Sequence, residues 1–282
     1  MNTITQYQNN LRLLSTQSIK IGIFDSGIGG ISILQQLIQL PGLELFYAAD
    51  TAHVPYGKRS NQEIKDLSHT IIEFLVLQQH VELIIIACHT VSAIALDYLK
   101  EQFPSIKFIG MVDLVIEQAT KITQSGRIGI IATKATISSK IHKKRILELN
   151  QHLQVFDQAC PRLASTIEKD YANSTKITTL LHHYLRFLLK NNIDTLILGC
   201  THYALIKNNI QNAIGPNIIL ISADQTITTA INPLISPLLS ASTIQWFVTG
   251  NCTLFKNTIT SLLPTKNEPI NKIKKPLFKT RL

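Results

Sequence analysis

The stretch Leu196-Ile197-Leu198-Gly199-Cys200-Thr201-His202-Tyr203 decides the fold that this sequence predicts. Three branched aliphatic residues lead into a glycine, a cysteine and a polar cluster, a pattern typical of a buried strand with a thiol at its carboxyl end. Ile84-Ile85-Ile86-Ala87-Cys88-His89-Thr90 repeats this plan 112 positions earlier, counted as 200 minus 88. A single cysteine in such a place is more often core filler, but two copies indicate that the two thiols act together.

The rest of the chain alternates short apolar strands with helical segments. Besides the two cysteine strands, strands are expected over 19–24, 45–50, 108–112, 127–133, 154–159, 218–221 and 246–250. Such alternation is typical of parallel sheets covered by helices. Two rounds of it, each with one cysteine strand, predict an α/β fold of two pseudo-symmetric lobes, each a parallel sheet flanked by helices.

The expected boundaries lie where the pattern stops or restarts. Residues 19–113 and 225–263 are assigned to a first lobe and residues 114–224 to a second. Residues 1–18 are polar and are expected to form a flexible N-terminal extension. Residues 264–282 carry six Lys or Arg side chains against one Glu, a net charge of +5, and are expected to form a basic C-terminal tail.

Composition limits the classes of function. A chain of 282 residues with 45% hydrophobic and 16% charged residues is globular. Its formal charge of +9 suggests nucleic acid, but no RNA-binding aromatic pattern or zinc-finger spacing accompanies the charge, so no specific nucleic-acid partner is expected. The polar start has no secretory signal and no apolar stretch could span a membrane. We therefore expect a cytoplasmic protein with no membrane partner, in which the four cysteines are thiols; a homodimer is left open.

The polar motifs share one position, the carboxyl end of a predicted strand. Parallel sheets place their ligand sites beyond these ends, so a cleft between two facing lobes would gather the motifs into one site. The motifs are Asp25-Ser26, Pro55-Tyr56-Gly57, Cys88-His89-Thr90, Cys160-Pro161 and Cys200-Thr201-His202.

Three familiar chemistries fit these motifs poorly. Gly27-Ile28-Gly29-Gly30 follows a strand, but the third glycine of a dinucleotide-binding motif would fall at Ser32, so the glycines are expected instead to let backbone amides approach a carboxylate. No Cys-x-x-Cys pair is present, and no metal site is expected. A cysteine–histidine acyl-transfer site needs one thiol and leaves the second unexplained.

Two symmetric thiols suit the inversion of a tetrahedral carbon. Removing a proton from one face and returning one to the other needs two acid–base groups on opposite sides. One must be a thiolate while the other is a thiol, and neighbouring groups are expected to set which is ionised. Asp25 and His202 are the candidates for that role.

Several motifs, in order, resemble those of glutamate racemases in the aspartate/glutamate racemase family. The resemblance rests on residues 24–30 (FDSGIGG), 49–57 (ADTAHVPYG) and 199–203 (GCTHY), with further matches at Cys160-Pro161, Glu168 and Ser222-Ala223-Asp224. It runs from about residue 19 to about residue 250. It implies a racemase without a cofactor that acts on a small amino acid, interconverts L- and D-glutamate and supplies D-glutamate for peptidoglycan.

The resemblance also implies roles for individual residues. Cys88 would deprotonate the D isomer and Cys200 the L isomer, assisted by Asp25 and His202. The substrate-binding residues it implies are Ser26, Pro55, Tyr56, Gly57, His89, Thr90, Glu168 and Thr201. The sequence departs from the family at His89, where Asn is usual, and at Ala204, where Pro is usual. A racemase for aspartate or another amino acid, or a weakly active homologue that serves as a binding protein, stays open as an alternative.

Overall fold

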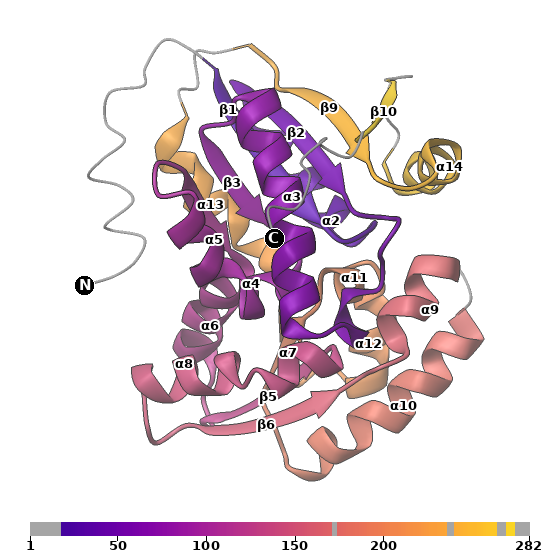
Figure 1. The fold of residues 1–282 in the computed structure, drawn as a ribbon. Coiled ribbons are helices and arrows are strands. Elements are labelled where there is room, and N and C mark those ends of the chain that lie inside the picture. The colour runs from indigo at the N-terminus through magenta and orange to yellow at the C-terminus, as the bar shows by residue number, and fades with distance from the viewer. Residues whose placement is uncertain (1–17, 171–173, 236–239, 264–268, 274–282) are drawn as a thin grey trace.

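The computed structural model describes residues 18–170, 174–235, 240–263 and 269–273, and it contains two parallel sheets (Figure 1). The first sheet has the strand order β10-β9-β2-β1-β3-β4 and the second has the order β6-β5-β7-β8. The first consists of β1 (Ile19–Asp25), β2 (Leu43–Ala49), β3 (Leu83–Ile86), β4 (Lys107–Gly110), β9 (Thr243–Val248) and β10 (Ile270–Lys272). The second consists of β5 (Arg127–Ala132), β6 (Gln154–Ala159), β7 (Thr195–Gly199) and β8 (Ile219–Ile221).

The two sheets repeat one topology. The order β2-β1-β3-β4 in the first corresponds strand for strand to β6-β5-β7-β8 in the second, and every pairing in both is parallel. The two-lobed α/β fold is therefore confirmed. The two cysteine strands, β3 and β7, hold equivalent positions in it.

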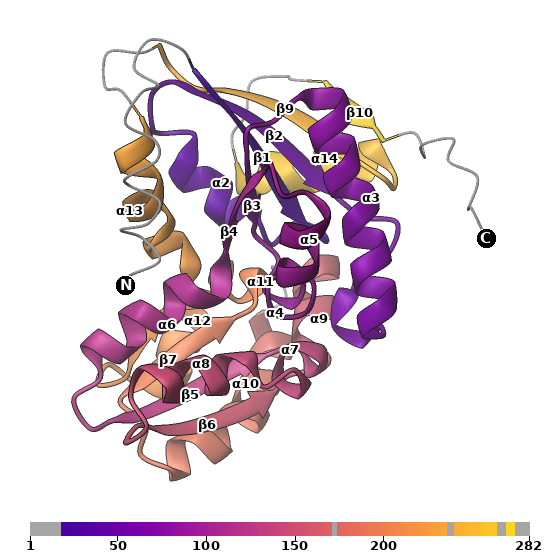
Figure 2. The same ribbon diagram turned by 60° about the vertical axis from the view of Figure 1, so that its left-hand side comes forward.

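Helices cover the sheets (Figures 1 and 2). Those in the first half of the chain and after β8 are α2 (Ile31–Leu37), α3 (Asn61–Gln79), α4 (His89–Ile94), α5 (Leu96–Gln102), α13 (Ile227–Ile231) and α14 (Cys252–Leu262). Between β4 and β8 lie α6 (Met111–Ile122), α7 (Lys134–Ser138), α8 (Ile141–Leu149), α9 (Leu163–Asp170), α10 (Ser174–Lys190), α11 (Thr201–Ala204) and α12 (Lys207–Ile214). Three short 3₁₀ turns complete the described elements: η1 (Tyr56–Lys58), η2 (Ala223–Gln225) and η3 (Asn232–Leu234). Across the described ranges, no helix combines the length and apolarity that crossing a membrane requires.

The core explains the aliphatic runs. Every residue of β3 and β7 is buried, as expected for central strands of a sheet covered on both faces. One hydrophobic cluster extends from the first sheet through α6 into the second, and Ile85, Val115 and Ile197 belong to it. The lobes therefore share a packed core on the side of α6, which connects β4 to β5.

Some elements differ from the sequence expectation. A helix begins directly at His89, not at residue 93, because Cys88 is extended and caps it. Helix α9 and strand β10 were not predicted. Strand β10 lies within the expected basic tail, 264–282, and pairs with β9 through Ile270–Lys272. The other expected tail residues, apart from 269 and 273, lie outside the described residues, as does the expected N-terminal extension apart from Ser18.

Candidate functional site

The two thiols occupy equivalent strand ends. Cys88 follows β3 and precedes α4, and Cys200 follows β7 and precedes α11. In the first sheet, β1 lies between β2 and the cysteine strand β3. In the second sheet, β5 lies between β6 and the cysteine strand β7. Such a reversal of strand order opens a crevice at the carboxyl edge. Repetition of the topology thus places one thiol at each of two facing crevices.

Both thiols line one cavity of about 30 Å³ between the lobes. Around them it gathers most of the residues expected from the sequence: Ser26, Pro55, Tyr56, Gly57, His89, Thr90, Thr201 and His202. Asp25 and Glu168 do not line it, although each bonds to a residue that does. The buried thiol of Cys160 also faces this cavity, and burial, followed by the nearby Cys200 charge, raises the pKa of Cys160.

Cys200 is adjacent to a buried imidazole. Its Sγ lies 3.7 Å from Nδ1 of His202, and Nε2 of the same ring bonds to the Glu168 carboxylate. Burial on its own lowers the pKa of His202, but the hydrogen bonds and charges of Cys200 and Glu168 outweigh it and hold that pKa well above the usual value. An imidazolium therefore stands beside Cys200, where it stabilises negative charge on the sulfur.

Cys88 has a different environment. Its Sγ lies 3.6 Å from the hydroxyl of Ser26. Burial raises the pKa of the Cys88 thiol to about 12, and the charge of Asp25 acts in the same direction, while the backbone amide of Val91 and the Ser26 hydroxyl oppose the shift. The two sulfurs are thus set apart electrostatically, with Cys88 held as the thiol.

Asp25 links the two lobes and bonds to neither thiol. Its Oδ1 accepts from the Gly27 amide at 2.8 Å, and its Oδ2 accepts from the Thr201 hydroxyl at 3.0 Å. Burial raises the pKa of Asp25, against the lowering effects of His202 and of these two hydrogen bonds. Asp25 acts on Cys88 through its charge and on the Cys200 side through Thr201.

The glycine-rich loop after β1 contacts the second lobe closely. The Ile28 amide donates to Glu168 Oε2 at 3.2 Å. The carboxylate that the backbone amides of this loop were expected to approach is therefore a side chain of the protein itself. A Cβ on Gly27 would lie 2.6 Å from Glu168 Oε1, and one on Gly29 would lie 2.7 Å from His202 Nδ1. Glycine is needed at Gly29 because the backbone nitrogen of His202, 2.8 Å away, also occupies the space of a Cβ, whereas a Cβ at Gly27 would displace the end of the Glu168 side chain.

Tyr56 and Gly57 form another wall of the cavity. The Tyr56 hydroxyl donates to Asp50 Oδ2 at 2.6 Å, so towards a ligand this oxygen is an acceptor. A Cβ on Gly57 would lie 2.5 Å from Thr133 Cβ, which shows how closely the first lobe approaches the second here.

A cluster of three buried hydroxyls joins the lobes at Thr90. Its Oγ1 lies 3.0 Å from that of Thr133 and 3.2 Å from that of Thr136, and the latter two are 2.9 Å apart. Thr133 and Thr136 were not among the expected site residues. A signal was present: they follow β5, the counterpart of β1, whose end carries Asp25-Ser26.

His89 pairs with a histidine of the second lobe. Its ring lies 5.8 Å from that of His142 on α8, with 23° between their planes. Burial lowers the pKa of His89, and the His142 charge adds to this; burial lowers the pKa of His142 to about 4. Both rings are therefore neutral at pH 7, and His89 Nδ1 and His142 Nε2 are buried without a hydrogen-bond partner among the described residues.

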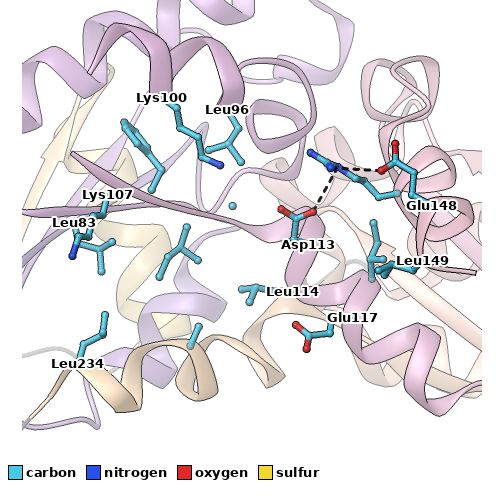
Figure 3. Close-up of a pocket in the computed structure, with 16 residues that line it drawn as sticks. Leu83, Leu96, Lys100, Lys107, Asp113, Leu114, Glu117, Glu148, Leu149 and Leu234 are labelled. Carbon is cyan, nitrogen blue, oxygen red and sulfur yellow. Dashed lines mark ion pairs between the residues drawn. The ribbon is translucent and has the colours of Figure 1, made fainter. Parts of the chain in front are cut away.

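Two further observations bear on other chemistries. Within the described ranges, no three His, Cys, Asp or Glu side chains are grouped as a metal ion requires. A second cavity, of about 180 Å³, lies between α5, α6, α8 and α13 (Figure 3). Its lining combines aliphatic with charged side chains, among them an Asp113–Arg145–Glu148 ion-pair group, and it contains no thiol or imidazole.

Comparison with known proteins gives one consistent family. Residues 32–227 match the Asp/Glu/Hydantoin racemase family. A curated glutamate racemase of Desulforudis audaxviator is 34% identical over 266 residues, which are 90% of this chain and 97% of that protein. The crystal structure of a glutamate racemase isoform from Bacillus anthracis superposes with a TM-score of 0.83 at 32% identity, covering 92% of this chain and 98% of that one. A glutamate racemase from Francisella tularensis, solved with D-glutamate, gives 0.83 at 29% identity and covers 93% and 99%.

Proposed function

Since the chain belongs to the Asp/Glu/Hydantoin racemase family, we propose that it interconverts L- and D-glutamate by proton transfer between Cys88 and Cys200, without a cofactor. The observation that carries this proposal is the pair of thiols, which follow equivalent strands and line one cavity. The D-glutamate formed would serve peptidoglycan synthesis in the cytoplasm.

The proposed reaction moves one proton at each face of Cα. The Cys200 thiolate removes the α-proton of L-glutamate, so that the C–H bond breaks and an S–H bond forms. The Cys88 thiol then donates its proton to the opposite face, which gives D-glutamate and leaves Cys88 as the thiolate. The reverse reaction starts from that state, so the two sulfurs carry one proton before and after each turnover, and two while Cα is deprotonated.

The surroundings of the two sulfurs support this division of roles. The imidazolium of His202 lies beside Cys200 and favours negative charge there. Cys88, with its raised pKa, starts as the acid. A pair in which one member is a base and the other an acid is what the first half-reaction requires.

The proposed binding groups surround the thiols. Ser26, Thr90, Thr201, Gly57 and Pro55 line the cavity and would contact the carboxylates and the ammonium group. Tyr56 and His89 complete the walls, and Glu168 acts through His202. Neutral His89 offers one donor nitrogen and one acceptor nitrogen, in place of the amide that the family usually has.

The test is exchange of the α-proton in D₂O, followed by proton NMR with each glutamate enantiomer. Both enantiomers should lose the α-proton signal and racemise. Cys88→Ser and Cys200→Ser should each lower kcat by at least about 10²-fold, the usual contribution of an acid–base group. Cys252→Ser is the matched control, since Cys252 is half-buried on α14 and does not line the cavity.

Other results would redirect or end the proposal. Exchange with aspartate or another amino acid, but not with glutamate, would keep the mechanism and change the substrate. A Cys88→Ser or Cys200→Ser variant that racemises at the wild-type rate would exclude the two-thiol mechanism. No exchange with any amino acid would favour the binding-protein alternative.

A further inference from the structure

A positively charged pocket, separate from the one in Figure 3, adjoins the cavity that holds the thiols. It has a volume of about 320 Å³ and four cationic lining residues, Lys58, Arg162, Lys169 and Lys176. They come from η1, the turn before α9, the end of α9 and the start of α10, and α9 and α10 run beside each other in Figure 1. We call these four residues and the space between them the outer basic pocket.

The outer basic pocket adjoins the cavity between the lobes. Lys58 and Ser165 line both spaces. All four cationic side chains are exposed. No acidic residue lines the pocket within the described ranges, and Lys58, Arg162 and Lys169 form no ion pair with a described residue. The charges of Lys58, Arg162 and Lys169 are therefore not neutralised locally by an ion-pair partner.

A concave surface lined by charges of one sign raises the local concentration of ligands of the opposite sign. Glutamate at neutral pH carries two carboxylates and one ammonium group, a net charge of about −1. We propose that the outer basic pocket captures a carboxylate of the acidic substrate and delivers the substrate to the cavity between the lobes. This inference rests on the proposed function, because it takes glutamate as the ligand.

The test neutralises charge in the pocket and at a matched place outside it. Arg162→Gln/Lys169→Gln removes two positive charges from the pocket. Arg186→Gln/Lys190→Gln removes the same residue types from the far part of α10, where both are exposed and neither lines the pocket. The two double variants therefore have the same net charge and differ in where it was lost.

We expect kcat/KM to fall about threefold to fivefold for the pocket variant at about 20 mM NaCl, with kcat unchanged. The difference should nearly disappear at about 500 mM NaCl, where the Debye length is a few ångströms. The control variant should stay close to wild type at both salt concentrations. Thermal melting followed by circular dichroism checks that both variants are folded.

Two results would overturn the proposal: equal effects in the two double variants, or a loss in the pocket variant that salt does not reduce. Glutarate, a dicarboxylate with no stereocentre, separates this inference from the proposed function. Its binding, measured by saturation-transfer NMR, should weaken in the pocket variant even if the wild-type protein racemises no amino acid. Unchanged glutarate binding in the pocket variant would contradict the proposed capture role of the outer basic pocket and leave the proposed racemase function untouched.

Discussion

At the scale of single residues, the two thiols differ because their neighbours differ. Cys200 has a histidine two positions later, and the carboxylate of Glu168 holds the far nitrogen of that ring. Cys88 has a hydroxyl, Ser26, and the charge of Asp25. The sequence predicted that Asp25 and His202 would set which thiol is ionised. Ser26 and Glu168, which complete the two environments, lie far from the thiols in sequence.

Glu168 is the residue at which this difference can be tested by pH. The raised pKa of His202 means that the imidazolium persists below that raised value and is lost as pH rises through it. Glu168→Gln removes one cause of the elevation, so the alkaline limb of the kcat/KM profile should move to lower pH, with a loss of about tenfold at its alkaline end. Initial rates between about pH 6 and about pH 10 measure it.

The control for this prediction is Glu148→Gln. Glu148 is exposed on α8, and its ion pairs are with Lys144 and Arg145. Its loss should leave the alkaline limb in place. If the Glu168 variant keeps the wild-type profile as well, Glu168 does not hold the proton on His202.

At the scale of elements, the sequence predicts longer elements with clear ends better than very short ones. β6 (Gln154–Ala159) and α3 (Asn61–Gln79) agree with expectation because their patterns are long and have clear ends; α3 starts at a capping box of Ser60 and Glu63. Strand β10 has three residues, two of them exposed, and too little apolar periodicity to be recognised.

The candidate site shows the same division at this scale. Strand ends gave Cys88, Cys200 and Ser26, because a buried strand that runs into polar residues is a local pattern. His142 was missed because only the facing of the two lobes brings it to His89. Thr133 follows a strand end, so the same local pattern could have found it. Contacts between lobes depend on tertiary geometry, which has no local signal.

The loop from Gly27 to Gly30 lies against helix α11, and a single substitution in this loop can test that contact. Gly29→Ala would place a methyl group against Thr201 and 2.7 Å from His202 Nδ1. We expect kcat/KM to fall by about 10²-fold, since small displacements of catalytic groups are that costly. Gly22→Ala, where the new Cβ meets the flexible end of Leu75 at 3.1 Å, should lower stability and keep kcat/KM. Steady-state kinetics and urea unfolding of both variants measure these effects; equal kinetic losses would contradict the role of Gly29.

At the scale of the whole molecule, the cavity is too small for the proposed substrate. A volume of about 30 Å³ accommodates about two water molecules, whereas an amino acid needs several times that space. We therefore predict that the lobes move apart when substrate enters. The core that the lobes share through α6 includes neither thiol. The contacts at Thr90, Gly57 and Ile28 are among those that opening would break.

Thr136→Val tests this motion without changing a residue that lines the cavity. Valine keeps the shape of threonine but removes the hydroxyl that bonds to Thr90 across the lobes. One such hydrogen bond contributes about 1 kcal/mol, so the closed form should lose about fivefold in population relative to the open form. Because the closed form leaves too little room for substrate and the open form admits it, we expect KM for glutamate to fall by up to that factor, with kcat little changed. The radius of gyration without substrate, measured by small-angle X-ray scattering, should increase.

Thr120→Val is the matched control, because that hydroxyl bonds only to carbonyls of its own helix, α6. Identical KM values and scattering curves for the two variants would mean that the hydroxyl cluster does not hold the lobes closed.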